Sequence, residues 1–216
     1  LDPDSCRPFD SSRAGLNLGE GAAFVVLERE SHALARGVQP LATLSGWGNA
    51  CDAFHQTASS EEGIGAVLAM QAALRRAGLQ PADIGYINAH GTGTPNNDAS
   101  ELAAVSSVFP TLPPLSSTKS ATGHTTSASG SVEAVMCLLA LQHHFLPANL
   151  HWSSAMDEDF TPVLVPTPAP QLRHVLCNAF AFGGNDTALV FSQYDTVQSE
   201  EQPSAIPAPR AVYLHQ

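Results

Sequence analysis

The chain has 216 residues, 44% of them hydrophobic, and a formal net charge of -11 from 20 acidic and nine basic side chains. This length suits one ordinary domain or one half of a larger two-domain enzyme. The acidic balance argues against nucleic acid and anionic membranes as partners, because both attract basic patches. No apolar run approaches the roughly 20 residues of a bilayer-spanning helix, and no export signal opens the chain. We therefore expect a soluble, cytoplasmic protein.

Cysteine and histidine spacing gives no metal or disulfide signature. The four cysteines are scattered without CxxC pairing, which suits a reducing cytoplasm: Cys6, Cys51, Cys137 and Cys177. Adjacent helical residues such as His143 and His144 point roughly 100° apart and do not easily share one ion. We predict no metal site.

The first half of the chain alternates between strand-like and helix-like periods. The pattern predicts strands over residues 22–28, 41–49 and 84–90, and helices over residues 30–37, 63–79 and 99–109. The helix over 63–79 would bury one stripe, formed by Ile64, Leu68, Ala72 and Leu79. Asn97 or Asp98 is expected to cap the next helix, with Glu101 in its first turn.

The second half continues this alternation. We expect a strand over residues 115–120 and then the longest helix, 127–145, with a buried face formed by Val132, Val135, Met136, Leu139 and Phe145. Residues 174–182 and 187–193 predict an antiparallel hairpin closed by residues 183–186, GGND. The sheet is then mixed, and the fold is α/β. We assign residues 1–195 to one domain and residues 196–216, rich in Pro, Ser, Glu and Gln, to a polar disordered tail.

Four ordered motifs carry a family resemblance: RPFDSSRAGLNLGEGAAFVVLE, INAHGTGTPNND, STKSATGH and NAFAFGG. In this order they resemble the β-ketoacyl-acyl carrier protein synthases, or ketosynthases, from about Cys6 to Phe191. The resemblance implies a thiolase-like fold and the C-terminal half of such an enzyme. The family's nucleophilic cysteine belongs to the N-terminal half, and nothing here matches its context. Cys177 is expected to be a small core residue.

The resemblance assigns His90 and His124 to the active site. Condensation removes carbon dioxide from a malonyl thioester, and the resulting carbanion attacks an acyl thioester on the nucleophile. Two neutral imidazoles that donate N–H groups would stabilise the enolate oxygen, at roughly 3 to 4 kcal/mol per donor. Lys119, the single lysine, is expected to be buried and paired with Glu101.

The same resemblance implies further site residues. Thr92 and Thr94 would bind the phosphopantetheine arm of an acyl carrier protein, although their hydroxyls can equally bond their own backbone. Phe182 would supply a backbone N–H to the oxyanion hole and gate the acyl pocket, with Gly183 and Gly184 giving the loop its freedom. The chain itself needs no cofactor.

Two departures from the family pattern fall in this loop. Ala181 replaces a glycine, and Asn185-Asp186 replaces Thr-Asn. Because a Cβ restricts the backbone, we hypothesise a stiffer or differently shaped gate that suits an unusual acyl chain, such as an unsaturated polyene.

Two functions remain open. The chain is either the C-terminal part of an active ketosynthase, in fatty acid or polyketide synthesis, or a non-catalytic partner subunit resembling a chain-length factor. Expected partners are an acyl carrier protein, malonyl and acyl thioesters, and a second ketosynthase chain in a homo- or heterodimer. Carrier proteins are acidic, so docking requires a local arginine patch, the absent half or the dimer partner. Alone, the chain is predicted to expose its pairing surface, with aggregation, obligate pairing or a strained fold as the result.

Overall fold

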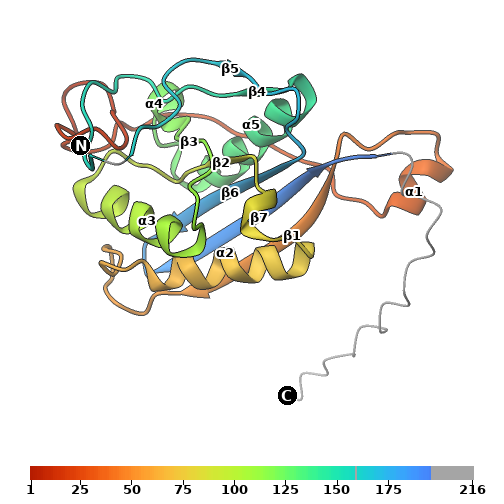
Figure 1. Cartoon of the computed structure of the whole chain (residues 1–216), viewed down its shortest axis with the longest axis horizontal. Coiled ribbons are helices and arrows are strands. Elements are labelled where there is room, and N and C mark those ends of the chain that lie inside the picture. The colour runs from red at the N-terminus through yellow and green to blue at the C-terminus, as the bar shows by residue number, and fades with distance from the viewer. Residues whose placement is uncertain (159, 196–216) are drawn as a thin grey trace.

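A five-stranded sheet with the strand order β1-β7-β6-β2-β3 forms the centre of the molecule (Figure 1). The structure is a computed structural model that describes residues 1–158 and 160–195, so the predicted tail at 196–216 lies outside the described residues. The central strands are Ala42–Cys51 (β1), Tyr86–Asn88 (β2), Leu115–Ser116 (β3), His174–Ala181 (β6) and Asn185–Gln193 (β7). A second, two-stranded sheet pairs Phe145–Leu146 (β4) with Thr167–Pro168 (β5).

Strand directions determine where the loops gather. β2 runs parallel to β3 and β6, whereas β7 is antiparallel to both β6 and β1. The sheet is therefore mixed, as predicted, and β1, β2, β3 and β6 all end at the same edge. In an α/β sheet, residues that follow the carboxyl ends of the strands commonly form the site.

Helices cover both faces of the sheet (Figure 1). α2 and α3 lie on one face and α5 on the other, and a separate apolar cluster fills each interface. The helices are Glu30–Ala35 (α1), Ile64–Ala77 (α2), Pro95–Val108 (α3), Lys119–Thr122 (α4) and Ser129–His143 (α5). Two 3-10 turns, Pro81–Asp83 (η1) and Thr126–Ala128 (η2), complete the connections. None of the described helices is long and apolar enough to cross a bilayer.

The predicted buried stripe of α2 is wrong. Ile64 is 55% exposed and Leu68 is also exposed, whereas the helix buries Ala66, Ala69, Met70 and Ala73. The reason lies on β1, where a Cβ added at Gly48 would stand only 1.9 Å from the carbonyl oxygen of Ala69. The strand and helix backbones approach so closely that small side chains must face the sheet.

The predicted face of α5 is also displaced. Val132, Val135, Met136 and Leu139 are only half-buried, as is Phe145 beyond the helix. Apart from Leu141, the buried residues of this helix are small or polar instead, and they include Glu133, Ala134, Cys137 and Ala140. Apolarity alone therefore did not identify the packed side of this helix.

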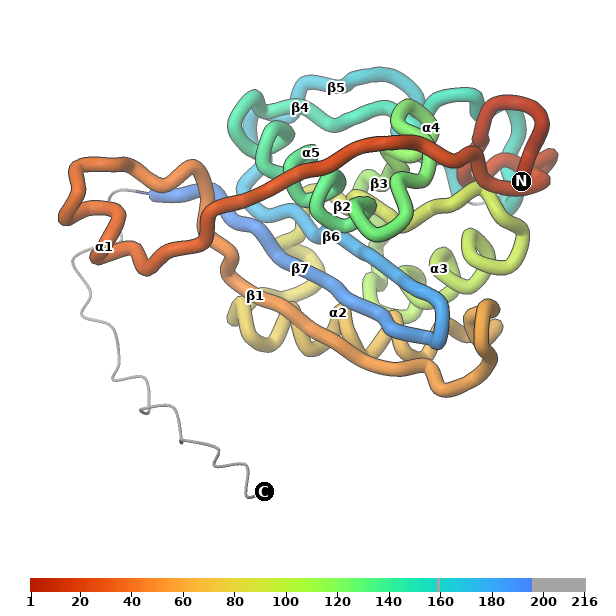
Figure 2. The backbone as a smooth tube through the Cα atoms, turned by 180° about the vertical axis from the view of Figure 1, so that it is seen from behind, coloured from red at the N-terminus to blue at the C-terminus, as the bar shows by residue number. Residues whose placement is uncertain are grey.

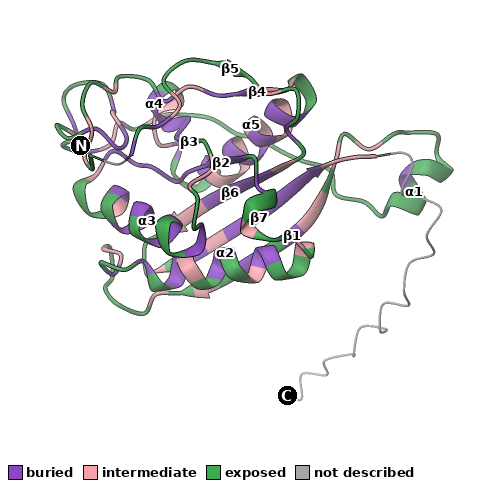
Figure 3. Cartoon of the chain, in the orientation of Figure 1, coloured by how far each residue is buried: buried purple, intermediate pink, exposed green. Residues whose placement is uncertain are grey.

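Residues 22–28 do not form the predicted strand. They lie in an irregular segment before α1, and Phe24 is 92% exposed, with Val26 and Leu27 also exposed (Figure 3). A strand needs a hydrogen-bonding neighbour, and none of the described segments pairs with this one. The apolar run is therefore left open to solvent in this chain.

Three element boundaries differ from the prediction. α3 begins earlier, at Pro95, with Thr94 as its N-cap, because proline suits the first helical position. β3 stops at Ser116, so Lys119 opens α4 instead of continuing a strand. The β6–β7 hairpin is confirmed, but its connection consists of residues 182–184, since Asn185 already pairs with Ala181.

The N-terminal segment crosses the face that carries α4 and α5 (Figure 2). Leu18 forms a parallel bridge with His124, and Asp10 forms an antiparallel bridge with Ala155. A Cβ on Gly19 would stand 2.0 Å from the carbonyl oxygen of Thr122, so only glycine fits this crossing. The segment thereby fixes the loop that contains His124.

Candidate active site

Two histidines from separate motifs meet at the edge where the parallel strands end. His90 follows β2, and His124 follows α4, yet their ring centroids lie 5.4 Å apart with an angle of 86° between the ring planes. The sequence prediction that these residues lie together is therefore confirmed. Their separation allows both rings to face a small group such as a thioester carbonyl.

His90 is buried and has a defined tautomer. The ammonium group of Lys119 lies 3.1 Å from Nδ1 of His90, and an ammonium can only donate. Nδ1 therefore accepts, which leaves the ring proton of neutral His90 on Nε2. Burial, together with the charge of Lys119, lowers the pKa of His90 well below its usual value, so the ring is neutral at pH 7.

His124 is held in the same tautomer by backbone groups. The N–H of Thr126 donates to Nδ1 of His124 at 3.1 Å, so Nε2 carries the proton. Burial and the charge of Lys119 lower its pKa to about 4. The backbone of His124 bonds to the N-terminal segment, donating to the Asn17 carbonyl at 2.8 Å and accepting from the Gly19 N–H at 3.1 Å.

Lys119 is buried, as predicted, but its predicted partner is wrong. Its ammonium forms an ion pair with Glu133 of α5 and donates to the His90 carbonyl at 2.5 Å. Together with His90 Nδ1, these contacts give three acceptors for three ammonium hydrogens. Glu101 is occupied elsewhere and has no ion pair with Lys119.

Glu101 instead orders the backbone of the first histidine motif. Its carboxylate accepts hydrogen bonds from the N–H groups of His90 at 2.9 Å and Gly91 at 2.8 Å, and from the Asn178 amide at 3.1 Å. Burial raises the pKa of Glu101 to about 7, and these three donors oppose that shift. Glu101 therefore fixes the backbone at His90 and Gly91.

The aromatic ring against His90 belongs to Phe180, which sequence reasoning missed. Its centroid lies 5.6 Å from that of His90. Phe182, two residues later, is 75% exposed at the hairpin tip, beside Gly183 and Gly184, whose φ angles are 82° and 74°. Alternation along β6 could have revealed Phe180, because it lies two positions from Asn178 on the strand.

The two threonine hydroxyls lie at the mouth of the first motif. Oγ1 of Thr92 and Oγ1 of Thr94 are 2.8 Å apart, and the N–H of Thr94 is 3.4 Å from Oγ1 of Thr92. This is the local bonding considered as the alternative to ligand binding. One hydroxyl hydrogen remains available, because only one of the two can occupy the shared bond.

Other candidate groups lie outside this cluster. Cys177 is buried in the core, as predicted, and a contact with Cys137 together with burial raises its pKa well above that of a free thiol. Within residues 1–158 and 160–195, no three His, Cys, Asp or Glu side chains are arranged to hold a metal ion.

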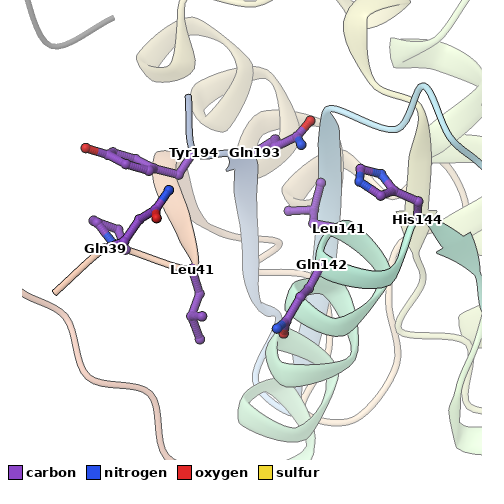
Figure 4. Close-up of a pocket in the computed structure, with 8 residues that line it drawn as sticks. Gln39, Leu41, Leu141, Gln142, His144, Gln193 and Tyr194 are labelled. Carbon is purple, nitrogen blue, oxygen red and sulfur yellow. The ribbon is translucent and has the colours of Figure 1, made fainter. Parts of the chain in front are cut away.

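A cavity of about 240 Å³ opens at the opposite edge of the sheet, where β1 begins and β7 ends (Figure 4). It contains none of the predicted site residues, and its lining is amide-rich: Gln39, Pro40, Leu41, Leu141, Gln142, His144, Gln193 and Tyr194. The chemistry at the histidine pair is thus separate from this hollow.

Comparison with known proteins agrees with the geometry. Residues 41–153 match the family described as beta-ketoacyl synthase, C-terminal domain. The mitochondrial 3-oxoacyl-[acyl-carrier-protein] synthase of Arabidopsis thaliana is 42% identical over 198 residues, covering 88% of this chain and 42% of that protein.

Two solved structures are similar in fold and sequence. The ishigamide ketosynthase/chain length factor has a TM-score of 0.85 and 38% identity, covering 90% of this chain and 48% of that one. A type II polyketide ketosynthase, in complex with its acyl-carrier protein, has a TM-score of 0.84 and 27% identity, covering 88% and 48%. The chain spans about half the length of these relatives.

Proposed function

Because this chain belongs to the β-ketoacyl synthase family, we propose that it is the C-terminal part of a condensing enzyme. It supplies the groups that stabilise the enolate when malonyl-acyl carrier protein condenses with an acyl thioester. The nucleophilic cysteine comes from an N-terminal half outside this sequence. The observation that carries the proposal is the 5.4 Å pairing of His90 with His124, both held as neutral Nε2–H donors.

The reaction uses these donors at the thioester oxygen. The malonyl carboxylate leaves as carbon dioxide, and its bonding electrons form an enolate whose oxygen is stabilised by the two N–H groups. The enolate carbon then attacks the acyl carbonyl on the cysteine, the new carbon–carbon bond forms, and the cysteine sulfur leaves as thiolate. Neutral rings suit this role, because a charged imidazolium would lose its proton to the developing base.

Lys119 contributes charge without touching the substrate. Its ammonium is enclosed by Glu133 and by the ring and carbonyl of His90, so it acts through His90. Burial lowers the pKa of both rings, and the positive charge of Lys119 adds to this shift, so both rings disfavour protonation. Lys119, Glu133 and Glu101 are positioning residues in this proposal.

The loop residues complete the site. The free hydroxyl of the Thr92–Thr94 pair is suited to bond a phosphopantetheine amide, and the N–H of Phe182 is proposed as a further oxyanion donor. Packing of this half against the N-terminal half would enclose Phe182, which is exposed here.

The acyl preference is proposed to depend on Ala181. This residue lies at the end of β6 opposite Asn185, without a positive φ angle, so its Cβ is unstrained in the present turn but opposes conformations that glycine allows. Profiling acyl chains of the wild type against Ala181→Gly tests the stiff-gate hypothesis, and identical profiles would remove it.

Carrier-protein docking is proposed to use another half or subunit. Arg75 and Arg76 form the exposed basic pair at the end of α2. Because α2 starts beside the end of β1 and runs back along the sheet, this pair lies at the edge opposite the histidines. An acyl arm delivered from there would enter on the wrong side.

The test is reconstitution with an N-terminal ketosynthase half that carries the nucleophile. We expect malonyl thioester decarboxylation by the pair, and a fall of about 100- to 1,000-fold with either His90→Ala or His124→Ala. His174→Ala is the control, since that histidine bonds Ser192 at the far edge. A stable pair without decarboxylation in any variant would favour the non-catalytic partner role.

A further inference from the structure

The Phe182–Gly184 turn is held by one neighbouring segment. The N–H of Asp52 donates to the Gly184 carbonyl at 2.8 Å, and the N–H of Gly183 donates to the Gln56 carbonyl at 2.7 Å. The thiol of Cys51 lies 3.5 Å from the Gly183 carbonyl. The position of the turn therefore depends on residues 51–56, which directly follow β1.

Asp52 is a carboxylate at the base of this contact that accepts three hydrogen bonds and keeps one acceptor site free. It accepts from the N–H of Ser60 at 2.6 Å, from the Ser60 hydroxyl at 2.8 Å and from the N–H of Gly65 at 3.1 Å. Although burial opposes ionisation, these donors lower the pKa of Asp52. Asp52 is consequently charged at neutral pH.

Asp186 places a second carboxyl group beside the first. It is only 6% exposed, and a Cβ added at Gly65 would stand 2.1 Å from its Oδ2, so both carboxyls lie against the same residue. No described donor bonds to Asp186. Burial, together with the charge of Asp52, raises its pKa to about 7.

The other groups around Asp186 bring no compensating charge. Its partners across β1 and β6 are Ala50 and Phe180, and the start of α2 presents Gly65. The titratable residues of the adjoining loop, His55, Glu61 and Glu62, are exposed to solvent. Among the described residues, the charged group that acts on a buried Asp186 carboxylate is the negative Asp52.

We propose that Asp186 and Asp52 share one proton at the base of the turn, and that losing this proton loosens the Phe182–Gly184 turn. The protonated Asp186 carboxyl can donate its O–H to Asp52, whereas two carboxylates repel each other. Because Phe180 pairs with Asp186 and packs on His90, the effect also reaches the histidine. The catalytic consequence rests on the proposed function, but the proposed proton sharing does not.

Amide hydrogen exchange in the 216-residue chain tests this inference. After correction for intrinsic exchange, protection of the Gly183 and Asp52 amides should fall about tenfold or more between pH 6 and pH 8. Asp186→Asn should remain protected at both pH values, because a carboxamide donates regardless of pH. Glu62→Gln, an exposed change in the same loop, should behave like the wild type.

Carbon-13 titration of the Asp186 carboxyl in the wild-type chain gives a second measurement that needs no variant. We expect a midpoint near neutrality. A midpoint near 4, equal protection of the wild type at both pH values, or the same loss of protection in Asp186→Asn would each overturn the proposal. Since neither measurement uses substrate, an inactive enzyme with a pH-sensitive turn would refute the proposed function alone.

Discussion

A single buried ammonium connects the residues of the site. Lys119 contacts Glu133 and two atoms of His90, and its field extends to His124. Both partners of this ion pair are almost completely buried, so neither charge has water as an alternative. The Lys119–Glu133 ion pair therefore affects both the stability of the fold and the protonation of the two histidines.

Lys119→Met should destabilise the chain by about 3 to 5 kcal/mol, because it leaves the Glu133 carboxylate buried and unpaired. The double variant Lys119→Met/Glu133→Gln should recover much of this loss. Denaturant unfolding measures both. Arg173→Met, which breaks an exposed ion pair with Asp195, should change stability by less than about 1 kcal/mol. A double variant as unstable as the single one would contradict the assignment of Glu133 as partner.

His124 gives a prediction with a defined sign. Its folded pKa, about 4, lies below the ordinary value of 6.5, so the unfolded chain binds the proton more readily. The contribution of His124 to stability is therefore complete above pH 6.5 and declines as the pH falls toward 4. His124→Gln should flatten this part of the profile of stability against pH relative to the wild type.

Nitrogen-15 spectra of the rings should show Nε2–H tautomers for His90 and His124 at pH 7, and Nδ1–H signals would contradict this.

Sequence motifs predicted which site residues come together but not how they bond. His90, His124 and Lys119 were all placed correctly in one cluster. The partner of Lys119 was not, because Glu101 and Glu133 are both carboxylates on helices that reach the site from opposite faces of the sheet, and only packing decides which one faces the ammonium. Phe180 was missed for a similar reason, since its apolar ring is equally suited to a core.

At the scale of elements, strands were predicted better than helix faces. The segments predicted as strands over residues 41–49, 174–182 and 187–193 correspond to β1, β6 and β7, although the predicted strand over 22–28 does not form. Which face of α2 or α5 is buried depends on the surface against which the helix packs. At α2, the close approach of Gly48 of β1 leaves room only for small side chains. The buried face of α2 that contains Ala69 is rich in alanine, and alanine contributes little to a hydrophobic periodicity in the sequence.

Gly48→Ala tests this close packing. The new Cβ would stand 1.9 Å from the Ala69 carbonyl oxygen, so α2 must move away from β1, and we expect a loss of about 2 to 3 kcal/mol. Gly78→Ala, with open space but a φ of 69°, should lose only about 1 to 2 kcal/mol, from backbone strain. Thermal unfolding compares the two variants. Equal stability of Gly48→Ala and the wild type would show that the helix tolerates displacement.

At the scale of the whole molecule, the described residues include two apolar surfaces without a packing partner that bear on pairing. One is the exposed run formed by Phe24, Val25, Val26 and Leu27, and the other is the half-buried row of α5. Residues 22–28 have the composition of a strand but lack a neighbour, which is why the sequence predicted an element that the chain does not form. The relatives are about twice as long as this chain. In the proposed function, these surfaces therefore pack against an N-terminal half.

Lysine substitutions in the exposed apolar run at residues 22–28 test whether this segment causes both self-association and binding to the N-terminal half. We expect the isolated wild-type chain to self-associate, since exposed apolar patches drive association. Phe24→Lys/Val26→Lys should shift the chain toward monomer in sedimentation velocity experiments and should abolish reconstitution with the nucleophile-bearing half. Ile64→Lys/Leu68→Lys, which charges two exposed positions on the outer side of α2, should leave reconstitution intact. Reconstitution by the first variant at wild-type yield would mean that residues 22–28 are not the pairing surface.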